Sequence, residues 1–440
     1  MTAEPLAPAP YDDELVVRAT VVAPPVSRRR RLITGVAILG AGVICILAWG
    51  LGAKPGEAAF GLSSIGDKVQ IPIVRVPGGP VAAVLGAVIV AFGAWQLIRG
   101  FPRRAMPLVT GAVLVAFVVA FLCWAATGQP GNPIDMLGVM QQSIFAAIPL
   151  ILGALAGILC ERSGVINVAI EGQLLAGAFA GALAASVAGN LGVGVVAAVA
   201  AGGLIGALLA VFSIRYLVNQ VVLGVVLNAF VLGMTNFGYN ALMQKNTQLY
   251  NSPGVLTAIR IPVLADIPII GPLLFDANII VYLTYALIVL VDVSLFRTRW
   301  GLRTRAVGEH PKAADTVGIK VLRTRYQNVV IGGLVAGLGG AFLTIGAVGN
   351  FNGNISSGKG FIALAAVIFG RWSPRGAIAA ALLFGFTDEL QIVLTVVGTP
   401  VNIPSAFLSM LPYVATLFAV AGLVGKVQAP AADGEPYVKG

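Results

Sequence analysis

Long apolar runs separated by short polar stretches dominate the order of side chains along this chain. Three such runs in the first third occupy residues 32–50, 81–98 and 106–127. Each has roughly the 20 residues that an α-helix needs to cross the ~30 Å hydrocarbon core of a bilayer. A polar break at 128–133 follows, so we predict three transmembrane helices in an N-terminal extension at 28–134. Residues 1–27, rich in Pro and Ala, are predicted to form a disordered cytoplasmic tail.

The rest of the chain continues the same pattern. Its apolar runs occupy residues 137–160, 169–188, 192–214, 221–243, 278–296, 327–347, 360–370, 376–397 and 406–425. The run at 360–370 is short, so it is either half of a broken or re-entrant helix or, if Arg371 and Arg375 mark a cytoplasmic turn, a crossing helix. We predict an all-α integral membrane protein, a polytopic bundle of about 10–12 transmembrane helices, some of them broken or re-entrant. Its main body is expected at 135–426, followed by a cytoplasmic tail at 427–440.

Glycines occur in pairs four residues apart inside several apolar runs. The pairs are Gly177/Gly181, Gly202/Gly206 and Gly333/Gly337. In lipid, such small-residue faces let helix backbones approach closely. This spacing predicts a tightly packed bundle but does not identify a substrate.

Composition supports a membrane protein and removes several functional classes. Apolar residues make up 58% of the 440 residues and charged residues only 10%, against ~25% charged in soluble chains. The net charge of +10 lies mainly in short loops of one predicted side, which places both termini in the cytoplasm. A cell-membrane protein without a nucleic-acid partner is therefore expected. His310 is the one histidine, and the cysteines Cys45, Cys123 and Cys160 are far apart, so we expect no metal site and no histidine-based triad.

A polar segment at 161–173 interrupts the apolar body. Asn167 and Glu171 are four residues apart and would share one helix face, with Gln173 nearby. These side chains could line a solute path through the bundle. They could equally form a cytoplasmic turn and helix cap in which they pair with the backbone. The pattern leaves both interpretations open.

Further polar residues lie inside the apolar runs. Asn228 and Asn236 fall at roughly helical intervals, and Asp388 is followed by Glu389. Buried acids of this kind can relay protons or hydrogen-bond a solute. The run from Gly353 to Gly360 nearly matches a phosphate-binding loop, but Gly360 replaces the required hydroxyl residue and no strand precedes the run. Any ATP hydrolysis is therefore expected in another chain.

A strongly basic loop at 297–326 contains a short amphipathic stretch at about 311–318. A short helix there would suit docking to a soluble partner. The alternative is a solvated basic loop that only sets membrane orientation.

Residues 160–185, 301–319 and 358–386 together resemble the permeases of bacterial nucleoside ABC importers of the guanosine type. That family lies within the simple-sugar and branched-chain amino-acid permease superfamily. The likeness covers about 135–440, including the ending Pro436 to Gly440, and it identifies 135–426 as an ABC permease transmembrane domain.

The resemblance implies cytoplasmic ABC ATPase subunits, a second homologous permease and an extracellular solute-binding lipoprotein. It implies a nucleoside substrate that passes unmodified, so this chain is expected to be no enzyme, with no catalytic residues and no cofactor. The loop that couples to the ATPase would contain Gly301, Arg303, Gly308, Glu309, Ala313, Asp315 and Gly318. The substrate path would contain Asn167, Glu171, Gln173, Asn228, Asn236, Lys359, Phe361 and Asp388.

Three alternatives remain open from the residues. The same machinery could import a monosaccharide or a branched-chain amino acid. A proton-coupled secondary transporter would use Glu171 or Asp388 and Glu389 as its proton site. A membrane scaffold would transport nothing.

Overall fold

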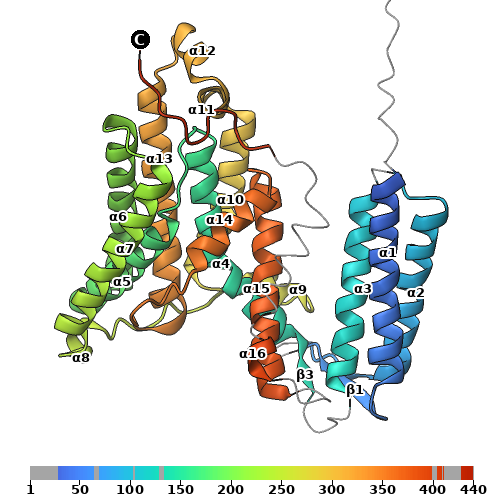
Figure 1. Ribbon diagram of the computed structural model, residues 1–440. Helices are drawn as coiled ribbons and strands as arrows, with labels where there is room; N and C mark the ends of the chain where they lie inside the picture. Colours follow the sequence, from blue (N-terminus) through green and yellow to red (C-terminus); the bar gives the residue numbers. More distant parts are fainter. Residues whose placement is uncertain are drawn as a thin grey trace, which may run out of the picture.

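A computed structural model describes residues 28–63, 69–102, 105–127, 133–398, 404–408, 410 and 428–439. Within these residues, ten helices are long and apolar enough to cross a bilayer. The predicted polytopic helical fold is confirmed (Figure 1). The expected tail at 1–27 and most of the apolar run at 406–425 lie outside the described residues.

The first three helices pack together as a bundle of their own. They are α1 (Arg28–Ile44), continued by the π-helical segment η2 (Cys45–Leu51), α2 (Gly78–Ile98) and α3 (Met106–Ala126). Their shared core contains Ile38, Cys45, Ala82, Ile89 and Val109. The apolar runs of the sequence thus give the three expected helices.

Short strands, which the all-α prediction did not include, connect this bundle to the body. Strand β1 (Glu57–Gly61) pairs antiparallel with β2 (Val74–Pro77) and parallel with β3 (Ile134–Asp135). Strand β3 leads directly into α4 (Met136–Glu161). A second pair, β4 (Ile259–Arg260) with β5 (Asp276–Ala277), is antiparallel.

Helices α4 and α13 (Val321–Ala341) form the centre of the body. Helix α13 continues as the π-helical segment η5 (Phe342–Val348), and these two spans are the most buried of the ten. On one side lie α5 (Ile170–Ala188), α6 (Leu191–Ala210) with η3 (Val211–Arg215), and α7 (Gln220–Gly238) with η4 (Tyr239–Met243). On the other side lie α10 (Ile279–Arg297), α14 (Lys359–Phe369) and α15 (Pro374–Val397). Short helices α8 (Thr247–Tyr250), α9 (Ile270–Phe275) and α16 (Ser405–Leu408) complete the described elements, with α11 and α12 introduced below.

The paired glycines meet where α5, α6 and α13 cross. A Cβ atom at Gly202 would lie 2.4 Å from both the carbonyl oxygen of Gly333 and the Cα of Gly337. A Cβ at Gly177 would lie 2.5 Å from the carbonyl oxygen of Gly337. The small-residue spacing therefore serves close helix packing, and that prediction is confirmed.

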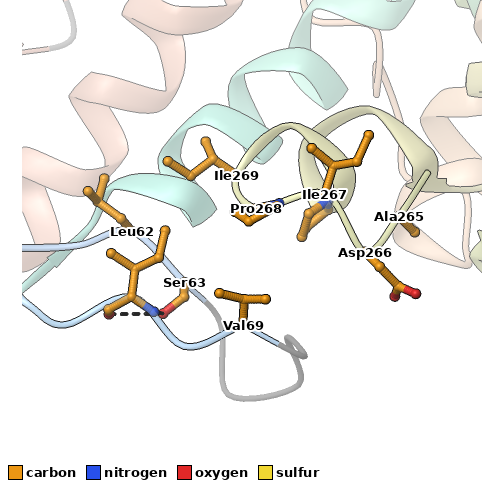
Figure 2. A pocket seen from close by; sticks show the side chains of 10 residues that line it. Leu62, Ser63, Val69, Ala265, Asp266, Ile267, Pro268 and Ile269 are labelled. Atoms are coloured by element: carbon orange, nitrogen blue, oxygen red, sulfur yellow. Dashed lines mark hydrogen bonds between the residues drawn. The ribbon is translucent and has the colours of Figure 1, made fainter. Parts of the chain in front are cut away.

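Besides the β1–β3 pairing and the apolar cluster around it, the N-terminal bundle touches the body at two places among the described residues. Leu122 and Trp124 of α3 pack in one cluster with Leu390 and Leu394 of α15. Figure 2 shows the second place, where the segment around Leu62 and Ser63 approaches residues 265–272. The hollow there has a volume of about 10 Å³, the room of about one water molecule. It is a contact between segments and offers no space for a cargo.

Candidate solute cavity and coupling loop

The segment between α13 and α15 runs from the end of η5 towards the end of the bundle where α4 finishes, first as irregular backbone and then as α14. Helix α14 has 11 residues, a rise of about 16 Å, which is half of the ~30 Å core. It ends in a turn where Arg162 donates from Nε to the carbonyl oxygen of Trp372 at 2.9 Å. Helix α14 is a half-length helix that follows the partly buried non-helical stretch 349–358 and ends in the Arg371 turn beside the end of α4, so this segment crosses the bundle as a broken helix.

Glu171 holds the start of α14. Its Oε1 accepts hydrogen bonds from Ser356 Oγ at 2.6 Å and from the Gly358 backbone N–H at 2.8 Å. Its Oε2 accepts one from the Gly360 N–H at 2.6 Å. Non-helical backbone at membrane depth must have its polar groups satisfied within the protein, and a carboxylate at a helix N-terminus also interacts favourably with the helix dipole. Glu171 meets both requirements.

Glycine is needed at position 360 because the two segments touch there. A Cβ at Gly360 would lie 2.3 Å from the backbone nitrogen of Glu171. The run from Gly353 to Gly360 therefore forms the loop that leads into α14. The backbone donors of Gly358 and Gly360 are already bonded to a carboxylate, so they are not free to bind a phosphate.

Neighbouring amides fix the irregular stretch between α4 and α5. Asn167 Nδ2 donates to Gln173 Oε1 at 3.0 Å, and both side chains are fully buried. Asn228 of α7 accepts from the Gly172 N–H at 2.7 Å and donates to the carbonyl oxygen of Val168 at 2.9 Å. These contacts tie α7 to the chain on either side of Glu171, in agreement with the backbone-pairing interpretation of this segment.

A cavity of about 490 Å³ lies beside the loop that leads into α14. Its polar and charged lining consists of Gln142, Asn278, Lys359, Asp388 and Glu389. Its apolar walls include Phe145 and Phe342, whose ring centroids are 6.2 Å apart in an edge-to-face arrangement, together with Pro149, Leu256, Leu343, Val348 and Ile355. The volume and the mixed lining are those of a small-molecule site.

Six segments build this cavity: α4, the loop 255–258, the start of α10, η5, the stretch 355–359 and α15. Asn278 caps α10 through its side chain and donates to the carbonyl oxygen of Gly346 at 2.7 Å, joining the start of α10 to the end of η5. Asp388 and Glu389 come from α15, and Lys359 opens α14. The cavity therefore lies towards the end of the bundle where α10 begins and η5 ends.

Of the eight residues predicted for the substrate path, Lys359 and Asp388 line the cavity. Asn167, Glu171, Gln173 and Asn228 lie in the hydrogen-bond network described above. Asn236 is half-buried, close to Gly353. Phe361 is 49% exposed and is not among the lining residues.

The sequence did not single out Gln142 or Asn278 as cavity residues. Both look ordinary along the chain, one in the first turns of a helix and one at a helix cap. Pro149 inside α4 was the available signal, because a proline within a membrane helix often marks a cavity wall.

The opposite end of the bundle carries the basic loop. It forms two short helices, α11 (Arg299–Glu309) and α12 (Pro311–Thr316) (Figure 1). Gly301 and Gly308 are buried at close contacts, since a Cβ at Gly308 would lie 2.3 Å from the carbonyl oxygen of Arg162. Arg303, Glu309 and Ala313 are exposed, Asp315 is half-buried, and Gly318 ends the pair with a φ of 84°.

Charges around this loop interact with the turn that follows α4. Burial lowers the pKa of the Arg162 guanidinium, whereas the carboxylate of Glu309 favours its charged form. Glu309 Oε2 also accepts a hydrogen bond from the Ala431 N–H at 3.1 Å. The loop is thus an ordered surface attached to the bundle and to the C-terminal segment.

The membrane helices form a bundle that has a polar cavity near one end and an ordered basic helix pair at the other. This is the arrangement of a membrane transport subunit. A family model described as branched-chain amino acid transport system / permease component matches residues 139–420. The chain belongs to this family of multi-pass membrane permeases, and the resemblance inferred from the sequence is confirmed.

Two relatives are similar over nearly their whole length. A guanosine ABC transporter permease protein of Bacillus subtilis is 40% identical over 312 residues, which cover 69% of this chain and 97% of the relative. A nucleoside ABC transporter permease protein of Lactococcus lactis is 35% identical over 308 residues, 68% of this chain and 96% of the relative.

A putative glucose ABC transporter permease protein of Haloferax volcanii is 34% identical over 255 residues, 58% of this chain and 77% of the relative. No solved structure matches this chain.

Proposed function

We propose that this chain is the permease subunit of an ATP-driven importer that takes up nucleosides. The observation that carries the proposal is the 490 Å³ cavity, which is lined by charged and amide side chains together with Phe145 and Phe342. A nucleoside presents an aromatic face that can pack against such rings and polar edges that need hydrogen-bond partners. The relatives named for guanosine and nucleosides support this cargo.

In this proposal, cytoplasmic ATPase subunits bind the surface of α11 and α12, and a second permease completes the pathway. An extracellular solute-binding protein delivers the nucleoside to the cavity at the other end of the bundle. The basic residues Arg297, Arg299, Arg303, Lys312 and Lys320 gather at the α11–α12 end, which agrees with a cytoplasmic location and with cytoplasmic termini.

Residues 28–134 are, in the same proposal, an addition to a complete permease. The family match begins at residue 139, and the Bacillus relative is almost fully covered by 69% of this chain. The addition supports α15, the helix that contributes Asp388 and Glu389 to the cavity.

Uptake of radiolabelled guanosine into proteoliposomes tests the proposal, with ribose, glucose and leucine as competing cargoes. The vesicles hold this chain with its partner permease and ATPase, and the binding protein is added on the outside. ATP-dependent accumulation of guanosine alone is expected. Accumulation of a sugar or leucine instead would replace the cargo, and accumulation driven by a proton gradient without ATP would contradict the importer class.

Asp388→Asn is expected to lower the initial rate of guanosine uptake about tenfold, since a hydrogen bond to a charged group is worth roughly 1.5–3 kcal/mol. The carboxylate lines the cavity and can accept from the hydroxyls or the amino edge of the cargo. Asp276→Asn, outside the cavity lining, is the matched control. Uptake within twofold of the unsubstituted protein for Asp388→Asn would remove this carboxylate from the binding site.

Glu309→Ala is expected to lower uptake roughly threefold, because exposed charged contacts are worth up to about 1 kcal/mol. The variant loses the contacts with Ala431 and Arg162 but should insert normally in the membrane. Uptake and amount of membrane protein are measured side by side, with Glu57→Ala as the control. Normal uptake together with normal ATPase association would contradict a coupling role for Glu309.

A further inference from the structure

The C-terminal segment at 428–439 crosses the end of the bundle beside α11 and the start of α13 (Figure 1). The Ala432 N–H donates to the carbonyl oxygen of Gly308 at 2.9 Å, at the end of α11. Tyr437 is 7% exposed and packs in one cluster with Val307, Ala314 and Val321. One segment therefore contacts α11, α12 and α13 together.

Arg325 anchors this segment from the first turns of α13. Although it is an arginine, its side chain is only 2% exposed. Its Nη1 donates to the carbonyl oxygen of Glu435 at 2.8 Å. Its Nη2 lies against the turn after α4, 2.7 Å from the position that a Cβ at Gly164 would take.

Unpaired polar atoms surround this anchor. Arg325 Nε and Nη2, Glu161 Oε1 and Asp433 Oδ1 are all buried without a hydrogen-bond partner among the described residues. Burial raises the pKa of Asp433 to about 7, although Arg325 favours its charged form. The free donors of Arg325 and the free carboxylate oxygens can form new hydrogen bonds if the segments shift relative to one another. Such an exchange does not require a fully paired network to be broken first.

The same turn leads to the cavity. The chain runs from Gly164 to Glu171 in seven residues, and Glu171 holds the start of α14, where Lys359 lines the cavity. Arg325 therefore contacts two segments. One is the C-terminal segment 428–439, which packs on α11 and α12, and the other is the turn after α4, which leads to Glu171 and the start of α14.

We propose that residues 428–439 act as a strap that holds α11 and α12 against Arg325. Arg325 is then a positioning residue, through which movement of α11 and α12 reaches the loop that leads into α14. This inference rests on the proposed coupling of α11 and α12 to an ATPase. It assigns to the strap a part in energy coupling as well as in stability.

The location of the strap is tested by thiol labelling, which needs no ATPase. Ala432 is 3% exposed whereas its neighbour Ala431 is exposed, and Cys45, Cys123 and Cys160 are all buried. A water-soluble maleimide should label Ala431→Cys readily and Ala432→Cys slowly. Adding Arg325→Gln to Ala432→Cys should raise its labelling rate roughly tenfold or more, because local opening then exposes the site. Slow labelling in that double variant would overturn the anchoring role.

The coupling role is tested by the amount of ATP hydrolysed per guanosine imported in the reconstituted complex. Arg325→Gln and Tyr437→Ala should raise this ratio roughly fivefold, the lower range of typical coupling between sites. Arg325→Lys keeps the charge and should restore part of the coupling. Val438→Ala, exposed on the same segment, is the control.

A parallel fall of hydrolysis and uptake, with an unchanged ratio, would show that the strap only stabilises the fold and would overturn the proposal. If Arg325→Gln does not insert, Tyr437→Ala decides the question by the same ratio. Failure of the unsubstituted complex to import guanosine with ATP contradicts the proposed function instead, while the labelling experiment still tests the strap.

Discussion

Replacing Gly337 by valine is expected to leave little folded protein in the membrane. A Cβ at this position would lie 2.4 Å from the carbonyl oxygen of Ala198 and 3.1 Å from the Cα of Gly202. These are backbone atoms of α6, so α6 and α13 would have to separate along their contact. Overpacking of a tight interface costs about 3 kcal/mol or more when the neighbours cannot yield. Thermal unfolding in detergent, followed by size-exclusion chromatography, measures the loss.

Gly233→Val is the matched control for Gly337→Val. Gly233 also lies inside a membrane helix, but a Cβ there would meet no atom within 4 Å. Both variants replace glycine by valine inside a helix, so the change in helix propensity is the same in each and only the packing differs. Equal amounts of folded protein for the two variants would contradict the close contact between α6 and α13.

Glu171→Ala is expected to abolish uptake and to lower the thermal stability of the protein. The change leaves the Ser356 hydroxyl and the N–H groups of Gly358 and Gly360 without their acceptor. Each buried polar group left unsatisfied costs roughly 1–3 kcal/mol. With three unsatisfied groups at the start of α14, the loop that leads into α14 should detach from its position beside α5. Lys359 would then no longer line the cavity.

Glu171→Gln separates two roles for this residue. The amide keeps the shape of the side chain, but its NH₂ group faces at least one backbone donor, so we expect a stability between those of the alanine variant and the unsubstituted protein. A proton site would behave differently, because glutamine would then stop uptake without any loss of stability. Glu57→Ala, an exposed acid in β1, is the control, and an alanine variant at 171 with unchanged stability and uptake would contradict the structural role.

The N-terminal bundle lies before residue 139, where the match to the family model begins. Leu390 and Leu394 of α15 pack against it, while Asp388 and Glu389 of the same helix line the cavity. Helix α15 therefore lies between the N-terminal bundle and the cavity. The short strands at 57–61, 74–77 and 134–135 fix this arrangement by backbone hydrogen bonds.

The sequence by itself determined the spanning helices. In lipid every backbone group must be paired within its own segment, so an apolar run of sufficient length becomes a helix whatever surrounds it. The glycine spacing likewise predicted close packing, because that property depends on side-chain size alone. The polar segments and the basic loop also pointed to regions of the chain that contribute to the cavity and to the α11–α12 surface.

Only the tertiary structure decided what those polar residues do. Glu171 and Ser356 are 185 positions apart, and no local pattern shows that the carboxylate bonds the start of α14. The same holds for the cavity, where Gln142, Asn278, Lys359 and Asp388 come from four separate segments. A helix period fixes which residues share a face, but the partner of that face is set by packing between distant segments. For this reason the sequence left both the role of Glu171 and the course of residues 360–370 open, and the fold resolved them together.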